Sequence, residues 1–386
     1  MLKREASQKI LQLARQYPVV TITGPRQSGK TTLCKMLFQQ KAYVSLEDID
    51  QRNFAEKDPR GFLDKLPKGA VIDEIQRAPD LLSYIQTIVD DRQQEGMYIL
   101  TGSQQFELLE GVSQSLAGRT ALVKLLPFSL SEAYGHRKRP PQLDTVLYTG
   151  FYPRIFDKKL NPTEAMSFYV NLYIERDLRQ IINIKDLSKF EIFLKLCAGR
   201  TGQILNLSSL GNDCGVNYGT IKSWISVLEA SFLIKLLRPY YKNFNKRLVK
   251  SPKLYFLDTG LACFLLGIND EKQLASHPLR GPLFESFVIS EILKTRFNTC
   301  KTDNLFYFRD NVGNEVDFVL DHGISVDQIE AKSGKTIGSD FFKGLQYFLG
   351  LNKDIKNSYL VYGGRESYTR EGVNITGWGD IGNIQA

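Results

Sequence analysis

An eight-residue segment near the start of the chain, 24–31, limits what this sequence can fold into more than any other feature. It follows the pattern GxxxxGK[ST] without a gap, and its residues are Gly24, Pro25, Arg26, Gln27, Ser28, Gly29, Lys30 and Thr31. A β-branched run, 19–23, precedes the segment, and a helical pattern begins at about Thr31. The two glycines let the backbone curl so that successive N–H groups point at phosphate oxygens. A strand, a glycine-rich loop and a helix in this order predict a nucleotide-binding α/β domain.

The polar residues of this segment are the types that ATP and Mg²⁺ require. Lys30 is predicted to bridge the β- and γ-phosphates, and the Thr31 hydroxyl to ligate Mg²⁺. The positive end of the helix dipole adds to the attraction for phosphate. We count Thr32, the next residue, among the cofactor-binding residues. A chance match to the pattern is the alternative, and the flanking strand and helix argue against it.

Two carboxylates follow a later apolar strand, 70–72, about one strand–helix–strand unit after the loop. Asp73 is predicted to hold the Mg²⁺ shell. Glu74 is predicted to polarise the attacking water, which requires a base within one hydrogen bond. The next strand runs into Thr101 and Ser103, and either hydroxyl could sense the γ-phosphate. A simple strand-end turn is the alternative for these two residues. The two carboxylates predict that ATP is hydrolysed as well as bound.

Short apolar segments separated by longer helical patterns predict a doubly wound parallel sheet in the first third of the chain. Its strands are expected at 19–23, 42–46, 70–72 and 97–100. Segment 135–141 breaks every periodicity and is expected to be a boundary. A helix is expected over 163–182, with these side chains near one face: Phe168, Leu172, Ile174 and Leu178.

Four short runs of residues, in a fixed order, carry a family resemblance: 22–27, 73–76, 100–103 and 116–119. With them the chain resembles a large prokaryotic family of AAA-type ATPases. The C-terminal half of that family carries a domain of unknown function similar to PD-(D/E)xK nucleases. The resemblance covers essentially the whole chain. It implies a five-stranded AAA core of strand order 5-1-4-3-2, a winged-helix segment and a nuclease-like tail.

The same resemblance implies that Arg119 is an arginine finger. In that role it stabilises transition-state charge on the γ-phosphate, from a neighbouring subunit if the protein forms a ring. The alternative is a structural arginine paired with a carboxylate. Arg176 and Asp177 on the following helix could be a pair of that kind.

The middle of the chain reads as a helix–turn–helix. Segment 208–210 is followed by a turn through Gly211 and Gly215 and by a second helix, 217–229. Asn217 is a good N-cap for that helix, whose apolar stripe is Ile221, Trp224, Ile225 and Leu228.

A strand, 232–237, and a basic segment that is expected to form a wing, 238–253, follow the second helix. The basic segment has no acidic residue, and its basic residues are Arg238, Lys242, Lys246, Arg247, Lys250 and Lys253. The aromatic residues among them are Tyr240, Tyr241 and Phe244. Such a segment could grip phosphates and stack on bases. The predicted nucleic-acid contacts are Lys242, Lys246, Arg247 and Lys250. A solvated hairpin whose aromatic side chains pack on its own helices is the alternative.

Two predicted strands near the C-terminus carry acidic residues at alternate positions. Asp317 lies on the first strand, 315–320, and Glu330 and Lys332 end the return strand, 326–332. Glu330 and Lys332 are two residues apart, so both face the same side of their strand.

Glu285 lies upstream in a predicted helix, 283–293. Glu, then Asp, then ExK is the PD-(D/E)xK layout, in which carboxylates hold Mg²⁺ or Mn²⁺ and the lysine positions or activates water. The predicted metal ligands here are Glu285, Asp317 and Glu330, and the catalytic residues are Asp317, Glu330 and Lys332. An inherited fold with polar remnants and no activity is the alternative.

Composition adds weaker limits. A formal charge of +8 favours a polyanionic partner such as DNA but does not demonstrate one. The five scattered cysteines form no metal-like cluster and suggest reduced thiols in a cytosol. The first residues lead into an amphipathic helix, and the densest apolar stretch, 261–268, is too short to span a bilayer. We therefore expect a cytoplasmic protein without a membrane segment, with a homo-oligomer as a possible assembly.

The sequence thus predicts an α/β protein in four parts. They are an AAA-type ATPase core over 1–135, a helical lid or linker over 136–187, a winged-helix segment over 188–269 and a restriction-endonuclease-like domain over 270–386. The first hypothesis is an ATP-driven enzyme that acts on DNA, with hydrolysis gating access to the nuclease-like site. The second is a nucleotide-dependent switch whose inactive tail only recognises DNA or a protein.

Overall fold

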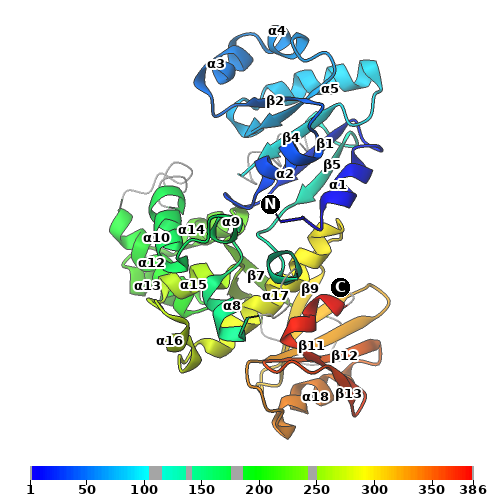
Figure 1. Cartoon of the computed structure of the whole chain (residues 1–386). Coiled ribbons are helices and arrows are strands. Elements are labelled where there is room, and N and C mark those ends of the chain that lie inside the picture. The colour runs from blue at the N-terminus through cyan, green and yellow to red at the C-terminus, as the bar shows by residue number, and fades with distance from the viewer. Residues whose placement is uncertain (1, 104–114, 136–140, 175–185, 242–249, 385–386) are drawn as a thin grey trace. The chain divides into compact units, whose positions relative to one another are not determined.

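The structure is a computed structural model that describes residues 2–103, 115–135, 141–174, 186–241 and 250–384. Contacts within the chain divide it into two compact units, and each is described by itself (Figure 1). Unit 1 comprises Met1–Phe128 together with two short later segments, Ala230–Phe232 and Arg296–Thr302. Unit 2 comprises the remaining residues.

Unit 1 is built on a five-stranded parallel sheet. Its strands are β1 (Val19–Thr23), β2 (Ala42–Ser45), β3 (Ala70–Asp73), β4 (Tyr98–Gly102) and β5 (Thr120–Lys124). The order across the sheet is β2-β3-β4-β1-β5, so the predicted order 5-1-4-3-2 is confirmed. β1 lies between β4 and β5 in this order, so the loop that follows it opens at the sheet edge with a strand on either side.

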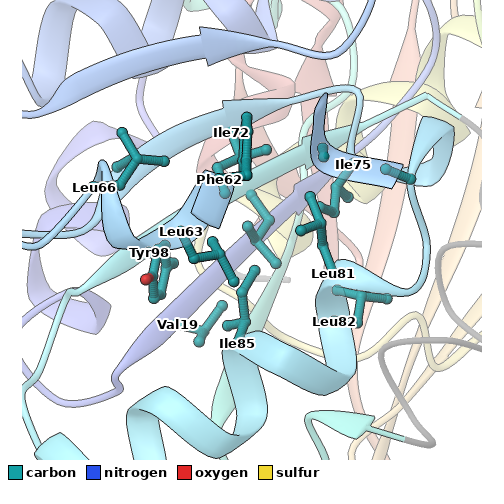
Figure 2. Packing of buried hydrophobic residues seen from close by; sticks show 14 of the residues in the cluster. Val19, Phe62, Leu63, Leu66, Ile72, Ile75, Leu81, Leu82, Ile85 and Tyr98 are labelled. Atoms are coloured by element: carbon teal, nitrogen blue, oxygen red, sulfur yellow. The ribbon is translucent and has the colours of Figure 1, made fainter. Parts of the chain in front are cut away.

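Helices cover both faces of this sheet because its strands are apolar on both sides. The helices are α1 (Ser7–Leu13), α2 (Lys30–Leu37), α3 (Ile49–Lys57), α4 (Pro59–Asp64) and α5 (Leu81–Arg92), with the 3₁₀ turn η1 (Ile75–Arg77) after β3. Val71 and Ile99 pack in the cluster that includes α1 and α2. Ile72 and Leu100, their neighbours in sequence, pack in the opposite cluster with α3, α4 and α5 (Figure 2). Each fully buried side chain of this size contributes about 1.5–3 kcal/mol, so the two clusters fix the sheet and the loops at its edge.

Unit 2 contains most of the helices among the described residues, although the C-terminal ends of α14 and α17 belong to unit 1. The helices are α7 (Leu130–Tyr134), α8 (Leu143–Thr149), α9 (Pro153–Lys158), α10 (Pro162–Tyr169), α12 (Leu187–Gly199), α13 (Leu207–Cys214), α14 (Tyr218–Ala230), α15 (Thr259–Leu265), α16 (Glu271–Ala275), α17 (Arg280–Asn298) and α18 (Lys343–Leu351). Shorter helical turns are η2 (Val170–Ile174), η3 (Ser339–Phe342) and η4 (Trp378–Asn383). No helix among the described residues is both long enough and apolar enough to cross a membrane.

The helix–turn–helix pattern of the middle segment corresponds to α13 and α14. The Asn217 side chain accepts a 2.9 Å hydrogen bond from the Thr220 N–H and so caps the start of α14. The four residues of the predicted stripe are all buried. The helix expected over 163–182 differs, because α10 ends at Tyr169 and the chain continues as the π-helical turn η2. Phe168 and Leu172 are exposed rather than packed on a shared face, and Leu178 lies outside the described residues.

The strands of unit 2 form one nine-stranded sheet. They are β6 (Gln203–Ile204), β7 (Ile234–Pro239), β8 (Lys253–Phe256), β9 (Leu305–Arg309), β10 (Glu315–Asp321), β11 (Val326–Lys332), β12 (Ile355–Tyr362), β13 (Tyr368–Arg370) and β14 (Val373–Gly377). The order is β13-β14-β12-β11-β10-β9-β7-β8-β6. β7 pairs with β9 in parallel, so the sheet continues across the domain boundary expected at residue 270. The four-part division of the chain remains a prediction.

Candidate functional site

The loop between β1 and α2 has the backbone that a phosphate cradle requires. Gly24, Gln27 and Gly29 all have positive φ, of 154°, 60° and 92°. A Cβ added to Gly24 would lie 2.1 Å from the carbonyl oxygen of Leu125, so only glycine fits at that position. Gln27 adopts the left-handed conformation without being glycine, at a cost of about 1 kcal/mol or more. The buried sheet on which the loop is mounted offsets this strain.

Lys30 is the first residue of α2, and its ammonium is turned back onto the loop. Its Nζ donates hydrogen bonds to the carbonyl oxygens of Gly24 at 2.9 Å and Pro25 at 2.8 Å. Burial lowers the pKa of Lys30 to about 8, although Glu74 and Asp73 act to raise it. The buried Ser28 hydroxyl has no hydrogen-bond partner among the described residues. An unpaired hydroxyl, a helix N-terminus and a buried ammonium fit the phosphates of a nucleotide.

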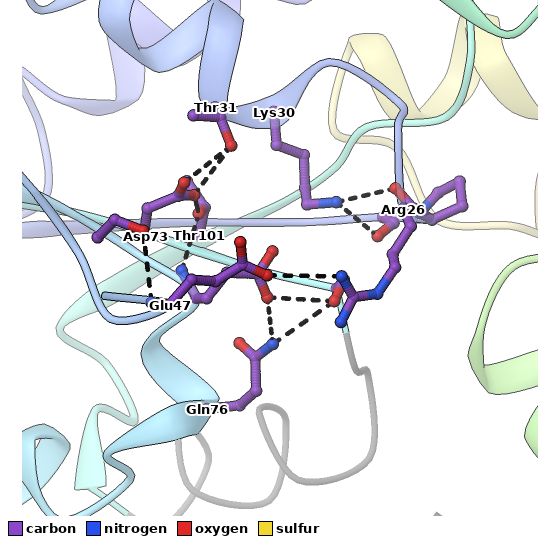
Figure 3. A network of polar contacts seen from close by, with 12 residues as sticks. Arg26, Lys30, Thr31, Glu47, Asp73, Gln76 and Thr101 are labelled. Atoms are coloured by element: carbon purple, nitrogen blue, oxygen red, sulfur yellow. Dashed lines mark hydrogen bonds and ion pairs between the residues drawn. The ribbon is translucent and has the colours of Figure 1, made fainter. Parts of the chain in front are cut away.

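Asp73, at the end of β3, lies next to Thr31 at the start of α2 (Figure 3). The Thr31 hydroxyl is 2.9 and 3.1 Å from the two carboxylate oxygens of Asp73. Tyr43 donates a 2.7 Å hydrogen bond to one of these oxygens, and Thr101 donates to the other. A hydroxyl beside a carboxylate is the donor set that Mg²⁺ takes in phosphate-binding sites, so these residues fit the ion.

Glu74 follows Asp73 in a left-handed conformation, with φ 59° and ψ 47°. Its carboxylate oxygen Oε2 accepts hydrogen bonds from the Gln76 side-chain amide and from the Ser103 hydroxyl, the latter at 3.2 Å. The Glu74 N–H lies 3.4 Å from the Thr101 hydroxyl. Both candidate sensors are therefore engaged with carboxylates, Thr101 with Asp73 and Ser103 with Glu74 (Figure 3).

The remaining predicted residues of the loop lie at its rim. Arg26 is partly exposed and forms an ion pair with Glu47 at 3.5 Å. Thr32 is exposed on the first turn of α2. Sequence reasoning did not assign roles to Tyr43 and Gln76. Nothing in the pattern around Tyr43 signals its contact, whereas Gln76 belongs to the run 73–76 that carried the family resemblance.

Arg119 lies just before β5 and is held by Asp90 of α5. Its Nε and Nη2 are 2.5 and 2.8 Å from the two carboxylate oxygens, and both side chains are partly exposed. The ion pair lowers the pKa of Asp90. A carboxylate partner was the structural alternative for Arg119. Arg176 and Asp177, which the sequence suggests as an ion pair of this kind, lie outside the described residues.

A second polar cluster lies in unit 2, on α17, β10 and β11. Lys332 forms ion pairs with Glu330 and, at 3.6 Å, with Asp317. Asp317 lies where the pairing of β10 with β9 shifts register, and its Oδ2 accepts a 2.9 Å hydrogen bond from the Ala331 N–H. Glu285 accepts a 2.9 Å hydrogen bond from the Tyr255 hydroxyl. The structure thus brings together the acidic residues and the lysine that the sequence placed in one site.

Electrostatics link these side chains into one cluster. Burial and, after it, the charge of Asp317 raise the pKa of Glu285 to about 7, against the opposing effect of Lys253. Burial and Asp317 likewise raise the pKa of Glu330 to about 8, against the opposing effect of Lys332. One oxygen of Glu330, Oε2, is buried without a hydrogen-bond partner among the described residues. No group of three or more His, Cys, Asp or Glu side chains is placed to hold a metal ion in the described part of the chain. Mg²⁺ commonly takes only one or two protein carboxylates, a number that Asp317 and Glu330 supply.

Lys253 and Tyr255 of β8 belong to the same cluster, whereas the sequence pattern assigns Lys253 to the wing. The Lys253 side chain is instead buried and forms ion pairs with Glu315 and, at 4.0 Å, with Asp317. The wing interpretation is therefore wrong for Lys253. Its burial follows from the pairing of β8 with β7, which no local pattern specifies.

The predicted nucleic-acid contacts of the basic segment and its residue Tyr240 differ in exposure, whereas Arg238 and Tyr241 are exposed. Lys250 is exposed, as a nucleic-acid contact requires. Tyr240 is buried and packs edge-to-face against Phe306 and Phe348, so it is a core residue rather than a base-stacking one. The other predicted contacts lie outside the described residues: Lys242, Lys246 and Arg247.

Family models match three consecutive parts of the chain. Residues 16–134 match a model described as an AAA domain. Residues 140–272 and 280–380 match two models described as domains of unknown function, DUF8612 and DUF4143. Residues 16–134 have the fold of an AAA-type ATPase. This conclusion agrees with the parallel sheet of unit 1 and the loop that follows β1.

Two uncharacterized mycobacterial proteins, one from Mycobacterium tuberculosis and one from Mycobacterium bovis, are similar in sequence. Each is 29% identical over 325 residues, which is 83% of this chain and 71% of the relative. Among solved structures, a Walker-type ATPase of Pyrococcus abyssi is 14% identical. It covers 69% of this chain and 96% of its own, with a TM-score of 0.47. AMPPCP-bound DnaA from Aquifex aeolicus is 16% identical over 58% of this chain and 85% of its own, with a TM-score of 0.30.

Proposed function

We propose that this chain binds ATP with Mg²⁺ and hydrolyses it at the loop between β1 and α2. One observation carries the proposal. Lys30, the Thr31–Asp73 pair and Glu74 lie together at the carboxyl edge of one parallel sheet, and this arrangement supports the proposal. The match of residues 16–134 to an AAA domain supports it independently.

The residues would divide the work as follows. Lys30 exchanges its contacts with the loop carbonyls for the phosphates of ATP, and the loop N–H groups bind the same oxygens. Thr31 and Asp73 would hold Mg²⁺, which would supply positive charge against the phosphates. Glu74 accepts the proton of the attacking water, because Gln76 and Ser103 hold its carboxylate at the edge of the site.

Two substitutions test this assignment. Lys30→Ala is expected to abolish ATP binding in calorimetry, because it removes the buried ammonium, while Lys57→Ala on exposed α3 is the matched control. Glu74→Gln is expected to keep ATP affinity within about 2-fold and to lower turnover by at least about 100-fold, because it preserves shape but not the base. Unchanged affinity in Lys30→Ala would overturn the loop assignment. Wild-type turnover in Glu74→Gln would mean that another residue orients the water.

We further propose that the chain acts on DNA through unit 2. The capped helix α14 after α13, the exposed Lys250 and the cluster of Asp317, Glu330 and Lys332 support this proposal. The test offers the purified protein supercoiled, linear and single-stranded DNA, with and without ATP, in Mg²⁺ or Mn²⁺. Cleavage that requires a divalent ion is the expected result.

A nucleotide-dependent switch is the second candidate function, and the ion pairs of the C-terminal cluster favour it. Lys332 is paired with Asp317 and Glu330, so a metal ion must compete with an ammonium for both carboxylates. DNA binding that depends on ATP, without cleavage under any of these conditions, would establish the switch and exclude the nuclease.

A further inference from the structure

The turn after β3 places Gln76 directly on the proposed catalytic base. Glu74 adopts a left-handed backbone conformation, which is costly for a residue with a side chain. The 3₁₀ turn η1 then reverses the chain, and the fully buried Ile75 anchors that turn in the hydrophobic cluster. Gln76 is therefore held within reach of the carboxylate two residues before it (Figure 3).

Two donors meet on one oxygen of the Glu74 carboxylate. The Gln76 side-chain N–H and the Ser103 hydroxyl both donate to Oε2, and they lie 3.5 Å from each other. The other carboxylate oxygen, Oε1, receives no hydrogen bond from any described residue. The two donors thus hold the carboxylate and leave one of its oxygens available for a proton.

The carbonyl end of the Gln76 amide does not contribute to holding the side chain. Its carbonyl oxygen is buried and has no partner in the described part of the chain. The side chain is therefore held by its N–H end alone, through Glu74 and Ser103. Turning the amide over would set its carbonyl against the Glu74 carboxylate, so only the N–H end fits there.

The residue type matters as well. A lysine or arginine in the place of Gln76 would form an ion pair with Glu74 and oppose the uptake of a proton by the carboxylate. A neutral amide donates a hydrogen bond and leaves the full negative charge on the base. We propose that Gln76 is a positioning residue for ATP hydrolysis, which holds Oε2 of Glu74 with Ser103 so that Oε1 receives the proton of the attacking water. This proposal rests on the proposed function of the same site.

The test replaces Gln76 with methionine, which keeps the length of the side chain and removes the donor. Turnover of Gln76→Met is expected to fall roughly 10-fold or more, because small displacements of a catalytic group are costly. The affinity for ATP is expected to stay within about 2-fold, since Gln76 contacts the base and not the loop. Ser103→Ala should likewise lower turnover and leave the affinity for ATP within about 2-fold. Gln51→Leu, an exposed glutamine on α3, is the matched control and should behave as wild type.

A double-mutant comparison separates positioning from a general structural effect. In a Glu74→Gln background, residual hydrolysis is measured over hours with radiolabelled ATP. If Gln76 acts through Glu74, adding Gln76→Met should lower that residual rate by less than about 2-fold. A full 10-fold further loss, or wild-type turnover in Gln76→Met alone, would overturn the inference. If the wild-type chain binds ATP and never hydrolyses it, the proposed function fails first and takes this inference with it.

Discussion

Arg119 donates two hydrogen bonds to the Asp90 carboxylate, yet it lies where the family resemblance implies an arginine finger. A finger must leave Asp90 to reach ATP on a neighbouring subunit, whereas a structural arginine stays in place. Exposed ion pairs contribute little to stability, so Asp90 need not hold Arg119 tightly. The two roles therefore predict different consequences for removing the carboxylate.

We expect Arg119→Ala to lower turnover by about 10-fold or more and to change ATP affinity little, because the charge it supplies acts in the transition state. Asp90→Asn should keep or raise turnover, because it frees the same arginine. Mixing Arg119→Ala with Glu74→Gln should raise hydrolysis in mixed oligomers above the rate of either variant alone. Arg119 is structural if Asp90→Asn and Arg119→Ala each lower the melting temperature without a separate effect on turnover. The same conclusion holds if a mixture that is shown to co-assemble recovers no hydrolysis.

At this scale, local spacing predicted the residues that lie close together in sequence. Lys30 and Thr31 could be predicted because one loop and one helix start fix them both. The contact of Tyr43 with Asp73 could not be predicted, because it joins residues from different strands. The hydrogen bond of Gln76 to Glu74 depends on a left-handed residue, and nothing in the sequence marks that conformation.

Among the elements, the turn between β9 and β10 depends on one aspartate. Asp310 accepts hydrogen bonds of 2.9–3.0 Å from the N–H groups of Val312, Gly313 and Asn314. The Asn314 amide and the Tyr347 hydroxyl also donate to it. Burial alone would raise the pKa of Asp310, but these hydrogen bonds outweigh it and lower the pKa to about 2.

The depressed pKa gives a defined pH dependence. An aspartate with a lowered folded-state pKa contributes stability that is present above about pH 4 and is lost as the pH falls through 2. We expect Asp310→Asn to cost up to about 2 kcal/mol of unfolding free energy at pH 7, and this difference from wild type should shrink below pH 4. Urea unfolding at a series of pH values measures it. A difference that stays constant down to pH 2.5 would show that the carboxylate charge is not the source.

The basic segment after β7 yields a prediction about DNA. Reversing the charge of Lys246 and Arg247 together should weaken DNA binding and reduce the slope of log affinity against log salt by about 2, because two phosphate contacts are lost. The matched control reverses Lys57 on α3, which is exposed in unit 1. Fluorescence titration at several salt concentrations measures both quantities. A variant with wild-type affinity and slope would place DNA elsewhere or nowhere.

Strand positions could be predicted well where a β-branched run ends at a glycine, as at 19–23, or where a strand returns after a turn, as at 326–332. The strand expected over 326–332 lies at Val326–Lys332, and the strand expected over 19–23 lies at Val19–Thr23. The helix expected over 163–182 was less predictable, because a π-helical turn has no signature in a 3.6-residue period.

For the whole molecule, the least predictable feature is how distant strands combine. The parallel pairing of β7 with β9 joins segments about 70 residues apart in sequence into one sheet. This pairing and the hairpin of β7 with β8 bring Lys253 and Tyr255 to the acidic cluster. The acidic residues of that cluster could be predicted from the sequence. The contacts of Lys253 and Tyr255 with them could not, because they depend on the pairing of distant strands.

The acidic cluster is expected to bind a divalent ion through Asp317 and Glu330. If Asp317 and Glu330 share a divalent ion, removing either carboxylate should weaken metal binding at least about 10-fold and stop any DNA cleavage, while ATP hydrolysis in unit 1 continues. Asp317→Asn and Glu330→Gln test this in calorimetric titrations with Mn²⁺. An unchanged Mn²⁺ affinity in both variants would place the ion elsewhere.

Lys332→Met should behave differently from both. Its ammonium pairs with the two carboxylates, so its removal leaves them free and should tighten Mn²⁺ binding, yet cleavage should fail because the residue that positions or activates water is gone. Lys335→Met, an exposed lysine on the following loop, is the matched control and should leave both unchanged. Cleavage that persists in Asp317→Asn would expose a different site or a contaminant. If Lys332→Met binds Mn²⁺ more tightly but the wild type cleaves no DNA, the cluster is a metal-responsive element. ATP-dependent binding would then be the function of unit 2.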